Sequence, residues 1–536
     1  MFIIIGRKQV GEYIMTSNVD SSAIFDYVIL GAGPAGLQLG YFMEQSQKNY
    51  LILDKNDKAG SFFKQFPRHR KLISINKRYT GSDDPELGLK MDWNSLLSDD
   101  PNLLFTRYSE RYFPHADDYE RYLNDYANRF HLNIQYNQNV THITKEKYFI
   151  LTTTTGQTWS CRRLIVATGV SLMNKPEFPG SDLIDYYDTV SMDPTLFINK
   201  RVFIIGKGNS AFETADHLME TAAVIHVSGE KSIKMSWQTR FVGHLRAVNN
   251  NFLDSYQLKS QNAVLDGKVV SIRKENNTFY VTFDFARAND PCVELEYDYV
   301  IACTGFRFDD SLFDKKTCPI ALAINDRFPK QNACWESVST PDLYFAGTLT
   351  QMRDFKTSTS SVVHGFRYGV RSLIHILNKR YHATPLPQTA YSKDVVALVE
   401  HITKRATHTS SLWQQYGVLG DVVFVEKNGF TVLEDLPISY IREVLADEFS
   451  KHYFILSLEY GSISLVDPFD VSVSRPAQND PVNAHEGYYL HPILRYYQQG
   501  QLVAEHHGAE NLNNKWDSDL SHQKPMQAFI KHCLGI

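Results

Sequence analysis

Cysteine is scarce in this chain. Its 536 residues include six cysteines, and no two of them form a Cys-x-x-Cys pair; they are Cys161, Cys292, Cys303, Cys318, Cys334 and Cys533. Six cysteines in a chain of this length do not make a disulfide framework, so a reducing compartment is the default expectation. The absence of a Cys-x-x-Cys pair also disfavours a reductase that works through such a redox-active pair.

Long apolar runs and an excess of positive charge are missing as well. No apolar stretch approaches the roughly 18–20 residues that a transmembrane helix needs. The first residues lack the basic region of a secretory signal, and Met15 is an alternative start. Lys and Arg number 55 against 60 Asp and Glu, a net charge of −5, which argues against a bulk nucleic-acid binder. We therefore expect a cytoplasmic protein without a transmembrane segment and without a nucleic-acid partner.

One glycine motif lies in the context that dinucleotide binding requires. Residues 26–31 are typical of a buried strand, Gly31-x-Gly33-x-x-Gly36 follows, and a helix at 37–45 and a strand at 50–53 lead to Asp54. The first glycine permits the tight turn, the second lets the backbone approach a pyrophosphate, and the third lets helix and strand pack closely. Asp54 would accept a hydrogen bond from the ribose 2′-hydroxyl. The pattern predicts a dinucleotide site.

A second unit of the same kind lies at 201–227. A strand at 201–205 precedes Gly206-Lys-Gly208-Asn-Ser210-Ala, in which Ala211 replaces the third glycine, and a helix at 212–221 and a strand at 223–227 follow. Two dinucleotide folds suggest two cofactors, a flavin and a nicotinamide that delivers hydride. The loop that follows carries Lys231 and Lys234, which suit a 2′-phosphate, but also Glu230, which would repel it. These residues favour NADPH slightly, with NADH as the alternative.

The chain is longer than the roughly 250–300 residues at which one core stops growing, so several domains are expected. We predict an α/β fold with two Rossmann-like dinucleotide-binding domains, for FAD and NAD(P)H, and an additional α+β C-terminal region. The expected boundaries are 25–170 and 301–380 for the two parts of the FAD-binding domain and 171–300 for an inserted NAD(P)H-binding domain. A helix is expected at about 362–377, a linker at 383–389, and a C-terminal region of unknown role at 391–536.

Several motifs resemble those of flavin-containing monooxygenase-type flavoproteins. They are the two glycine motifs, a Phe113-Pro114 pair followed by an aromatic helix at 122–130, the strand ends Ala167-Thr168-Gly169 and Cys303-Thr304-Gly305, and Ser74-Ile-Asn76-Lys77. Longer blocks at 60–63, 67–81, 92–97, 208–215 and 249–259 are similar to a subfamily, the endoplasmic-reticulum flavoproteins associated with degradation, which are FAD-dependent oxidoreductase-domain proteins. The resemblance covers roughly 25–375. It departs from the family at Phe178-Pro-Gly180, where the histidine four residues after the glycine is Ile184.

The resemblance implies roles for individual residues. Gly31, Gly33, Gly36 and Asp54 would hold FAD, Val140 would lie at its adenine, and Gly206, Gly208, Asn209 and Ser210 would bind the NAD(P)H pyrophosphate. Asn76 is the one predicted catalytic residue, beside the flavin ring. The remaining predicted cofactor contacts are Pro34, Ala35, Lys55, Ser61, Phe62, Trp93, Thr168, Gly169, Gly305 and Gly347.

These residues predict a FAD-dependent NAD(P)H oxidoreductase. The first hypothesis is a monooxygenase that forms a C4a-(hydro)peroxyflavin and oxygenates a small nitrogen- or sulfur-containing substrate with molecular oxygen. The alternatives are a flavin-dependent reductase or oxidase without oxygen transfer, which the missing histidine favours, and a flavin-bound protein that recruits a partner. A protein partner or a dimer contact is expected to use 391–536. His364 is expected to be a packed histidine, and no metal site is expected because the C-terminal histidines lack ligand spacing.

Overall fold

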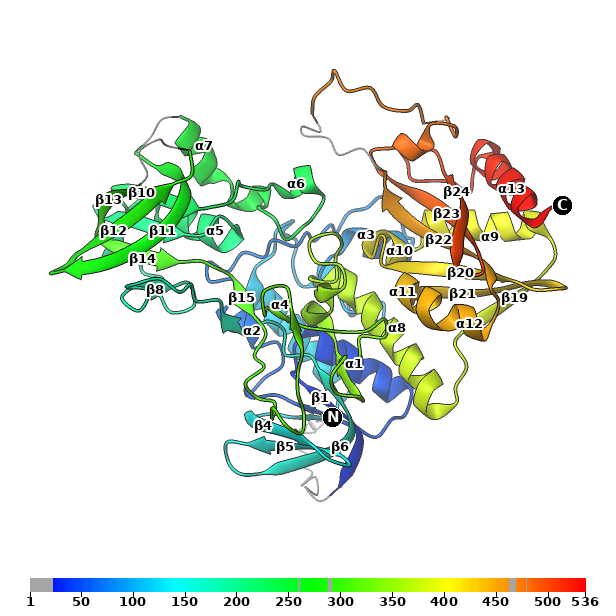
Figure 1. The fold of residues 1–536 in the computed structure, drawn as a ribbon, viewed down its shortest axis with the longest axis horizontal. Coiled ribbons are helices and arrows are strands. Elements are labelled where there is room, and N and C mark those ends of the chain that lie inside the picture. The colour runs from blue at the N-terminus through cyan, green and yellow to red at the C-terminus, as the bar shows by residue number, and fades with distance from the viewer. Residues whose placement is uncertain (1–22, 259–260, 288–291, 462–468, 479) are drawn as a thin grey trace, which may run out of the picture.

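The computed structural model describes residues 23–258, 261–287, 292–461, 469–478 and 480–536. The expectations about a secretory signal and about Met15 lie outside these residues. Within them, no helix has both the length and the apolar character needed to cross a membrane. Figure 1 shows three lobes: one around β10–β13, one around β1 and β4–β6, and one around β19–β24.

The first lobe in sequence is built on a seven-stranded sheet. Its strands are β1 (Ile24–Leu30), β2 (Tyr50–Leu53), β3 (Ile134–Gln135), β4 (Val140–Lys145), β5 (Phe149–Thr153), β6 (Thr158–Val166) and β18 (Leu343–Phe345). The order is β3-β2-β1-β6-β5-β4, and β18 joins the sheet as a parallel neighbour of β6. The parallel part, β3-β2-β1-β6-β18, is therefore completed by a strand that comes almost 180 residues after β6, and the intervening chain forms the second sheet.

The second sheet has the order β13-β12-β11-β10-β9-β14-β8. Its strands are β8 (Asp185–Tyr186), β9 (Arg201–Ile205), β10 (Val224–Gly229), β11 (Ala263–Glu275), β12 (Thr278–Phe285), β13 (Cys292–Tyr297) and β14 (Tyr299–Ala302). Two short helices, α6 (Ser236–Thr239) and α7 (Asn251–Gln257), lie between β10 and β11. The chain crosses from the first sheet to the second and later returns. The two crossing segments pair with each other, because β7 (Leu172–Met173) is antiparallel to β15 (Phe306–Arg307).

Two helices follow the glycine motifs directly. The helix α1 (Pro34–Gln45) begins one residue after Gly33, and α5 (Asn209–Leu218) begins one residue after Gly208. Both helices therefore start three residues earlier than the sequence suggests. The reason is that the second glycine of each motif is itself the N-cap, in extended backbone conformation, so the turn needs no further residues.

The C-terminal region forms a six-stranded antiparallel sheet of order β19-β21-β20-β22-β23-β24. The strands are β19 (Gln388–Ser392), β20 (Leu419–Val425), β21 (Gly429–Pro437), β22 (His452–Tyr460), β23 (Leu490–Gln498) and β24 (Gln501–His507). The expected linker at 383–389 is thus partly wrong: Gln388 and Thr389 belong to β19, because pairing with β21 satisfies their backbone groups. Helices α9 (Val395–His408), α10 (Ser410–Gln414) and α13 (Leu520–Leu534) belong to the same region.

Alternate residues of this sheet pack in opposite directions. Val423, Phe454 and Leu456 share a core with α9 and α13. Val422 and Ile455 instead share a core with the first lobe. Because successive side chains of a strand point to opposite faces, the C-terminal sheet has apolar cover on both faces. It is therefore packed into the molecule and is not a tethered tail.

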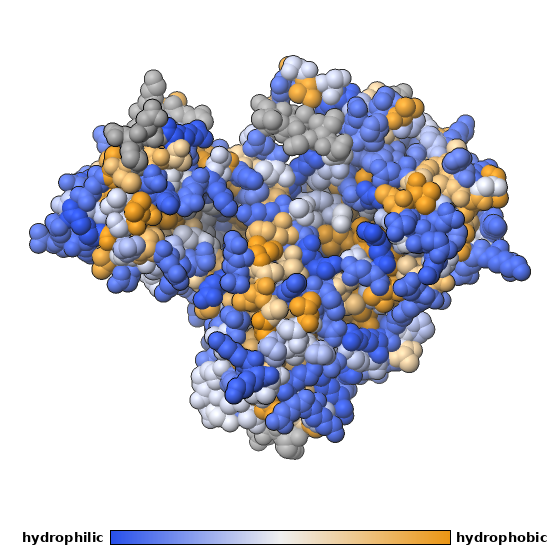
Figure 2. Space-filling view, viewed as in Figure 1, coloured by the Kyte–Doolittle hydropathy of each residue, from blue (hydrophilic) through white to orange (hydrophobic). Residues whose placement is uncertain are grey.

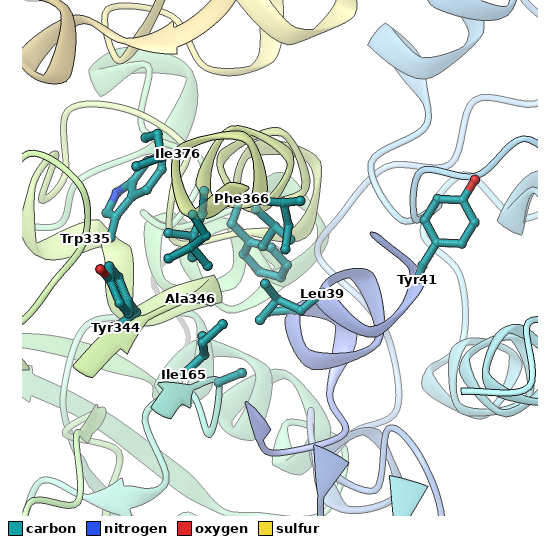
Figure 3. Packing of buried hydrophobic residues seen from close by; sticks show 14 of the residues in the cluster. Leu39, Tyr41, Ile165, Trp335, Tyr344, Ala346, Phe366 and Ile376 are labelled. Atoms are coloured by element: carbon teal, nitrogen blue, oxygen red, sulfur yellow. The ribbon is translucent and has the colours of Figure 1, made fainter. Parts of the chain in front are cut away.

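The long helix α8 (Val363–His382) joins the first lobe to the C-terminal sheet. Figure 3 shows its Phe366 beside Leu39 of α1, with Ile165 of β6 and Ala346 below. All of these side chains are buried in one cluster that also holds residues of β20–β23. Smaller helices complete this contact: α3 (Pro85–Met91) meets α10, and α11 (Ile438–Tyr440) and α12 (Ala446–Glu448) follow β21.

A buried ion network links α8 to the C-terminal sheet. Asp435 of β21 pairs with Arg371 of α8 at 2.6 Å and with Arg405 of α9 at 2.7 Å, and Ser411 donates to it as well. Arg405 also pairs with Asp421 of β20 at 2.6 Å. Burial alone would raise the pKa of Asp435, but the two guanidinium groups lower it below its usual value. Removing one member leaves buried charge without compensation.

We expect Asp435→Asn to lower the free energy of unfolding by about 3 kcal/mol, because it removes the shared carboxylate from two partly buried arginines. Asn tolerates the left-handed backbone of this position, φ +55°, so the loss reports the charge. Urea denaturation followed by circular dichroism measures it. The exposed Asp447→Asn is the control and should change stability by less than about 0.5 kcal/mol. Equal effects of the two substitutions would contradict the role of the network.

Candidate functional site

The first glycine turn shows why each glycine is needed. Gly31 has φ +110°, and a Cβ there would lie 2.8 Å from the Ala167 carbonyl oxygen. A Cβ on Gly36 would lie 1.9 Å from the Gly31 carbonyl oxygen. Gly33 differs: its backbone is extended, and a Cβ would meet no atom within 4 Å. Gly31 and Gly36 therefore serve the fold, and Gly33 keeps a space open.

That space lies at the N-terminus of α1, whose first-turn N–H groups have no partners inside the helix. Gly33 is the N-cap without a capping side chain, Pro34 is the first helical residue, and the first turn has no acidic residue. At the end of β2, the Asp54 carboxylate accepts hydrogen bonds from the N–H groups of Ala32 (2.7 Å) and Asn56 (2.8 Å). An anion is stabilised at such a helix end by the N–H groups and the helix dipole.

A cavity of about 340 Å³ opens at this turn. Eight of the predicted cofactor residues line it: Gly31, Gly33, Asp54, Lys55, Ser61, Phe62, Val140 and Thr168. Pro34, Ala35 and Gly36 continue the turn into α1; a Cβ on Gly347 would lie 2.6 Å from that of Ala35, and Gly169 follows Thr168 with φ +65°. Residues from four strand ends therefore meet here, as a dinucleotide site on a parallel sheet requires.

Some lining residues were not predicted from the sequence. Among them are Gln138, Asn139, Phe306, Asp309 and Leu312. Asn139 adjoins Val140, and Phe306 follows Gly305, so their neighbours in sequence could have indicated them. Asp309 and Leu312 carry no local signal, because they reach the cavity only when the chain returns from the second sheet.

The second glycine turn has the same construction as the first. Gly206 has φ +129°, and its Cβ would lie 2.3 Å from the Cys303 carbonyl oxygen, while a Cβ on Gly208 would meet no atom within 4 Å. Ala211 is fully buried, so a methyl group fits at the third position. Gly208 is the N-cap of α5, and Ser210 lies in its first turn. The N-terminus of α5 is therefore left open in the same way as that of α1.

The side chain of Asn209 is engaged within the protein. Its Nδ2 donates to the carbonyl oxygens of Gly243 (3.2 Å) and His244 (2.9 Å), and its Oδ1 accepts from the N–H of Arg246 (3.0 Å). Asn209 therefore anchors a loop beside the second turn. Gly305 lies where the chain returns from the second sheet to the first. Its φ is +80°, and its carbonyl oxygen accepts a hydrogen bond from the Asn174 N–H at 2.8 Å.

Asn76 and Trp93 are not among the residues that line the first cavity. Asn76 is 1% exposed, and its Nδ2 donates to the Ser109 carbonyl at 2.7 Å. Its Oδ1 has no hydrogen-bond partner among the described residues. Trp93 packs on His364 at 4.2 Å between ring centroids, and both line a second cavity of about 430 Å³. His364, expected to be a packed histidine, is 1% exposed, and neither ring nitrogen has a partner in the described chain.

Hydrogen bonds connect the first lobe to the second sheet beside the two glycine turns. Arg68 donates to the carbonyl oxygens of Asp188 (3.0 Å) and Val190 (2.5 Å), and its N–H donates to the Tyr187 hydroxyl at 3.1 Å. Tyr187 in turn donates to Glu213 of α5, which is 6% exposed. Burial raises the pKa of Glu213 to about 7. A carboxyl group that titrates near neutrality thus lies on the helix of the second turn.

Comparisons with known proteins agree with this geometry. Residues 28–347 match the family model described as pyridine nucleotide-disulphide oxidoreductase. The chain is 35% identical to the mouse FAD-dependent oxidoreductase domain-containing protein 2, over 95% of this chain and 84% of the mouse protein. That coverage includes most of the C-terminal region.

Two solved structures share the fold. A flavin-containing monooxygenase from Stenotrophomonas maltophilia is similar with a TM-score of 0.52 and 19% identity, covering 66% of this chain and 98% of that one. A bacillithiol disulfide reductase from Staphylococcus aureus is similar with a TM-score of 0.52 and 20% identity, covering 66% and 99%. Such low identities indicate a common fold and do not choose between the two chemistries.

The two open glycines give a matched test of the two sites. Gly33→Ala should leave the fold intact but weaken FAD binding about tenfold or more, because the methyl group fills the space kept for a phosphate. Gly208→Ala should leave FAD bound and weaken NADPH binding by a similar factor. Flavin content and anaerobic titration with NADPH measure both. The assignment of the second turn fails if Gly208→Ala binds and is reduced by NADPH like the wild type.

Glu213 predicts a pH dependence of stability. The pKa of Glu213 is about 7 in the folded protein, above the ordinary glutamate value of 4.5. Its contribution to the free energy of unfolding is therefore fully present at low pH and is lost as the pH rises through 7. Glu213→Gln has no carboxyl group to titrate. Its free energy of unfolding should therefore exceed that of the wild type by up to about 3 kcal/mol at pH 8, and by little at pH 4.5. Thermal unfolding at several pH values measures it. The exposed Glu220→Gln is the control; a constant difference for Glu213→Gln across pH would contradict the buried titration.

Proposed function

The chain belongs to the pyridine nucleotide-disulphide oxidoreductase family and, within it, to the relatives of FAD-dependent oxidoreductase domain-containing protein 2; on that premise we propose that it oxidises NAD(P)H through bound FAD and oxygenates a small organic substrate. The carrying observation is the pair of equally constructed glycine turns, each with one glycine that keeps a space open at a helix N-terminus. FAD suits the first turn, and NADPH or NADH suits the second.

The residues present fit a flavin. Gly33 provides the open approach for the pyrophosphate, the N-terminus of α1 stabilises its charge, and Asp54 lies where a ribose hydroxyl would be held. Bound FAD supplies the chemistry: it accepts a hydride and passes electrons onward, including to oxygen. The protein contributes position, charge and the exclusion of water.

Asn76 remains our candidate catalytic residue. Its buried, unpartnered oxygen is an acceptor, so it suits a donor such as the carboxamide N–H of nicotinamide or an N–H of the reduced flavin. The donor Nδ2 is already engaged with the Ser109 carbonyl, which fixes the direction of the side chain. Asn76 would thus orient a reacting group without exchanging a proton itself.

The cysteines support oxygen chemistry over disulfide exchange. All six are free, and burial raises the pKa of Cys303 to about 12 and that of Cys318 to about 11. A thiol attacks a disulfide as its thiolate, which these environments disfavour. The reaction implied by the name of the bacillithiol disulfide reductase is therefore less well supported here than that of the monooxygenase.

A second candidate is a flavin-dependent NAD(P)H reductase or oxidase without oxygen transfer. The observation that favours it is Ile184, at the position where the monooxygenase resemblance expects histidine. Ile184 is buried against Phe203 and Ile272 in the core of the second sheet. An isoleucine can make no hydrogen bond there, so this chain lacks whatever polar role the histidine has in the monooxygenases. The cytoplasmic location, and a protein partner or second copy at 391–536, stay predictions.

Stopped-flow absorbance tests the proposal. The purified yellow protein is reduced anaerobically with NADPH, and separately with NADH, and then mixed with oxygenated buffer. We expect reduction by a nicotinamide and then a long-lived species with one blue-shifted band in place of the two bands of oxidised flavin. Direct return of the two bands with stoichiometric hydrogen peroxide supports the reductase or oxidase. Reduction by neither nicotinamide would reject both and favour a flavin-bound binding protein.

A further inference from the structure

The second cavity lies where the three lobes meet, and we call it the aromatic cavity. Figure 2 shows hydrophobic residues in the middle of this face, but the Trp, Tyr, His and Arg residues of the cavity are not coloured as hydrophobic there. The cavity has a volume of about 430 Å³, a size that suits a small organic ligand. The first lobe, the loop after β10 and the C-terminal region all contribute walls, among them Trp93, His364, Arg240, Arg246, Trp413 and Tyr460.

Seven of the sixteen lining residues are Trp or Tyr. Trp93 comes from the first lobe and Trp237 from α6, while the C-terminal region adds Trp413, Tyr416 and Tyr460. The Tyr416 hydroxyl donates to the Arg240 carbonyl at 2.9 Å, which ties the C-terminal wall to the loop. Flat rings from different elements favour a flat ligand, because stacking and edge contacts add to the burial of apolar area.

The charge of the cavity has one sign. Two arginines line it, and none of the described lining residues is a carboxylate. The guanidinium of Arg240 lies 4.3 Å from the ring centroid of Tyr488 and 4.6 Å from that of Tyr460. The guanidinium of Arg246 lies 5.2 Å from that of Trp93. The guanidinium of Arg246 would repel a cationic ligand and attract an anionic one.

Arg246 is the better placed of the two to bind an anion. Its main-chain N–H is held by Asn209 at 3.0 Å, so the base of the side chain is fixed at the second turn. In the described chain its Nε is buried without a hydrogen-bond partner, and no carboxylate forms an ion pair with it. A partly buried guanidinium in this situation is stabilised when an anion enters.

His364 supplies an unpartnered polar group beside the same ring of Trp93. It is almost fully buried on the first turn of α8, packs on Trp93, and both of its ring nitrogens lack partners among the described residues. A polar side chain buried in this way is stabilised when a ligand provides the missing hydrogen bond. Arg246 and His364 therefore present polar groups beside the same ring of Trp93.

We propose that the aromatic cavity binds the organic substrate of the reaction, and that this substrate is a planar aromatic compound with a negatively charged group. The identification as substrate rests on the proposed function; the ligand class rests on the cavity alone. Arg246 binds the anionic group and the C-terminal region supplies the stacking wall. The region 391–536 therefore determines substrate specificity, and a simple amine, which is a cation at neutral pH, is a poor ligand.

Three compounds with the same ring test the class of ligand: indole-3-acetate, tryptamine and indole-3-ethanol, which are anionic, cationic and neutral. Isothermal titration into the FAD-bound protein gives each dissociation constant. We expect indole-3-acetate to bind at least about tenfold more tightly than tryptamine, with indole-3-ethanol between them. Equal affinities, or tighter binding of tryptamine, would overturn the proposal.

Two cavity variants and one control variant locate the interaction. Arg246→Gln should remove most of the preference for indole-3-acetate, while Arg162→Gln, at a half-exposed arginine of β6, should retain it. Trp413→Leu should weaken all three compounds by a similar factor. Each variant is compared at wild-type flavin content, which shows that it has folded. Unchanged affinity in both cavity variants would overturn the proposal.

A competition separates substrate from cofactor, since the phosphates of NADP⁺ are anions as well. We expect indole-3-acetate to bind with nearly unchanged affinity when NADP⁺ is saturating. Competitive displacement, with equal weakening of NADP⁺ binding by Arg246→Gln, would assign Arg246 to the cofactor and overturn the proposal. A protein that prefers the anion but does not oxidise NAD(P)H would reject the proposed function and leave the ligand class standing.

Discussion

The burial of α8 between two sheets is the constraint on which the rest of the structure depends. One side of the helix packs on α1 and the strand ends of the first lobe, and another packs on the C-terminal sheet. Its charged residue Arg371, which is partly buried, pairs with Asp435 of the C-terminal sheet. This packing fixes β18 and α1 at one end and the aromatic walls at the other. The C-terminal region lines the aromatic cavity, whereas the described residues that line the first cavity all lie between Leu30 and Leu312.

The two glycine turns solve the same physical problem twice. In each, the first glycine accepts a positive φ where a neighbouring carbonyl leaves no room for a side chain, and the second keeps an approach to the helix N-terminus open. The third position needs only a small residue, as Gly36 and Ala211 show. The hydrogen bonds from Arg68 to Tyr187 and from Tyr187 to Glu213 then hold the second turn against the first lobe. Two open helix N-termini on joined sheets suit the proposed transfer between two dinucleotides.

Local sequence predicted the parts of this fold whose causes are local. Strand, glycine turn and helix follow one another within 30 residues, so both dinucleotide units were identified, although both helices begin three residues earlier than expected. The placement of β18 beside β6, and the part of β19 that replaces an expected linker, depend on pairing with distant strands. For the same reason Asp309 and Leu312 could not be assigned to the first cavity, nor Arg246 and Trp413 to the aromatic cavity. These positions arise only when segments hundreds of residues apart are packed together.

We propose that a nicotinamide bound at the second turn delivers hydride directly to a flavin bound at the first. NADPH labelled with deuterium on one face or the other of its nicotinamide C4 can be used to follow flavin bleaching under anaerobic conditions. We expect one label to slow bleaching and the other to leave it unchanged, because the protein would present one face of the ring to the flavin. Direct hydride transfer would be ruled out if neither label changed the rate of bleaching, or if neither NADPH nor NADH bleached the flavin.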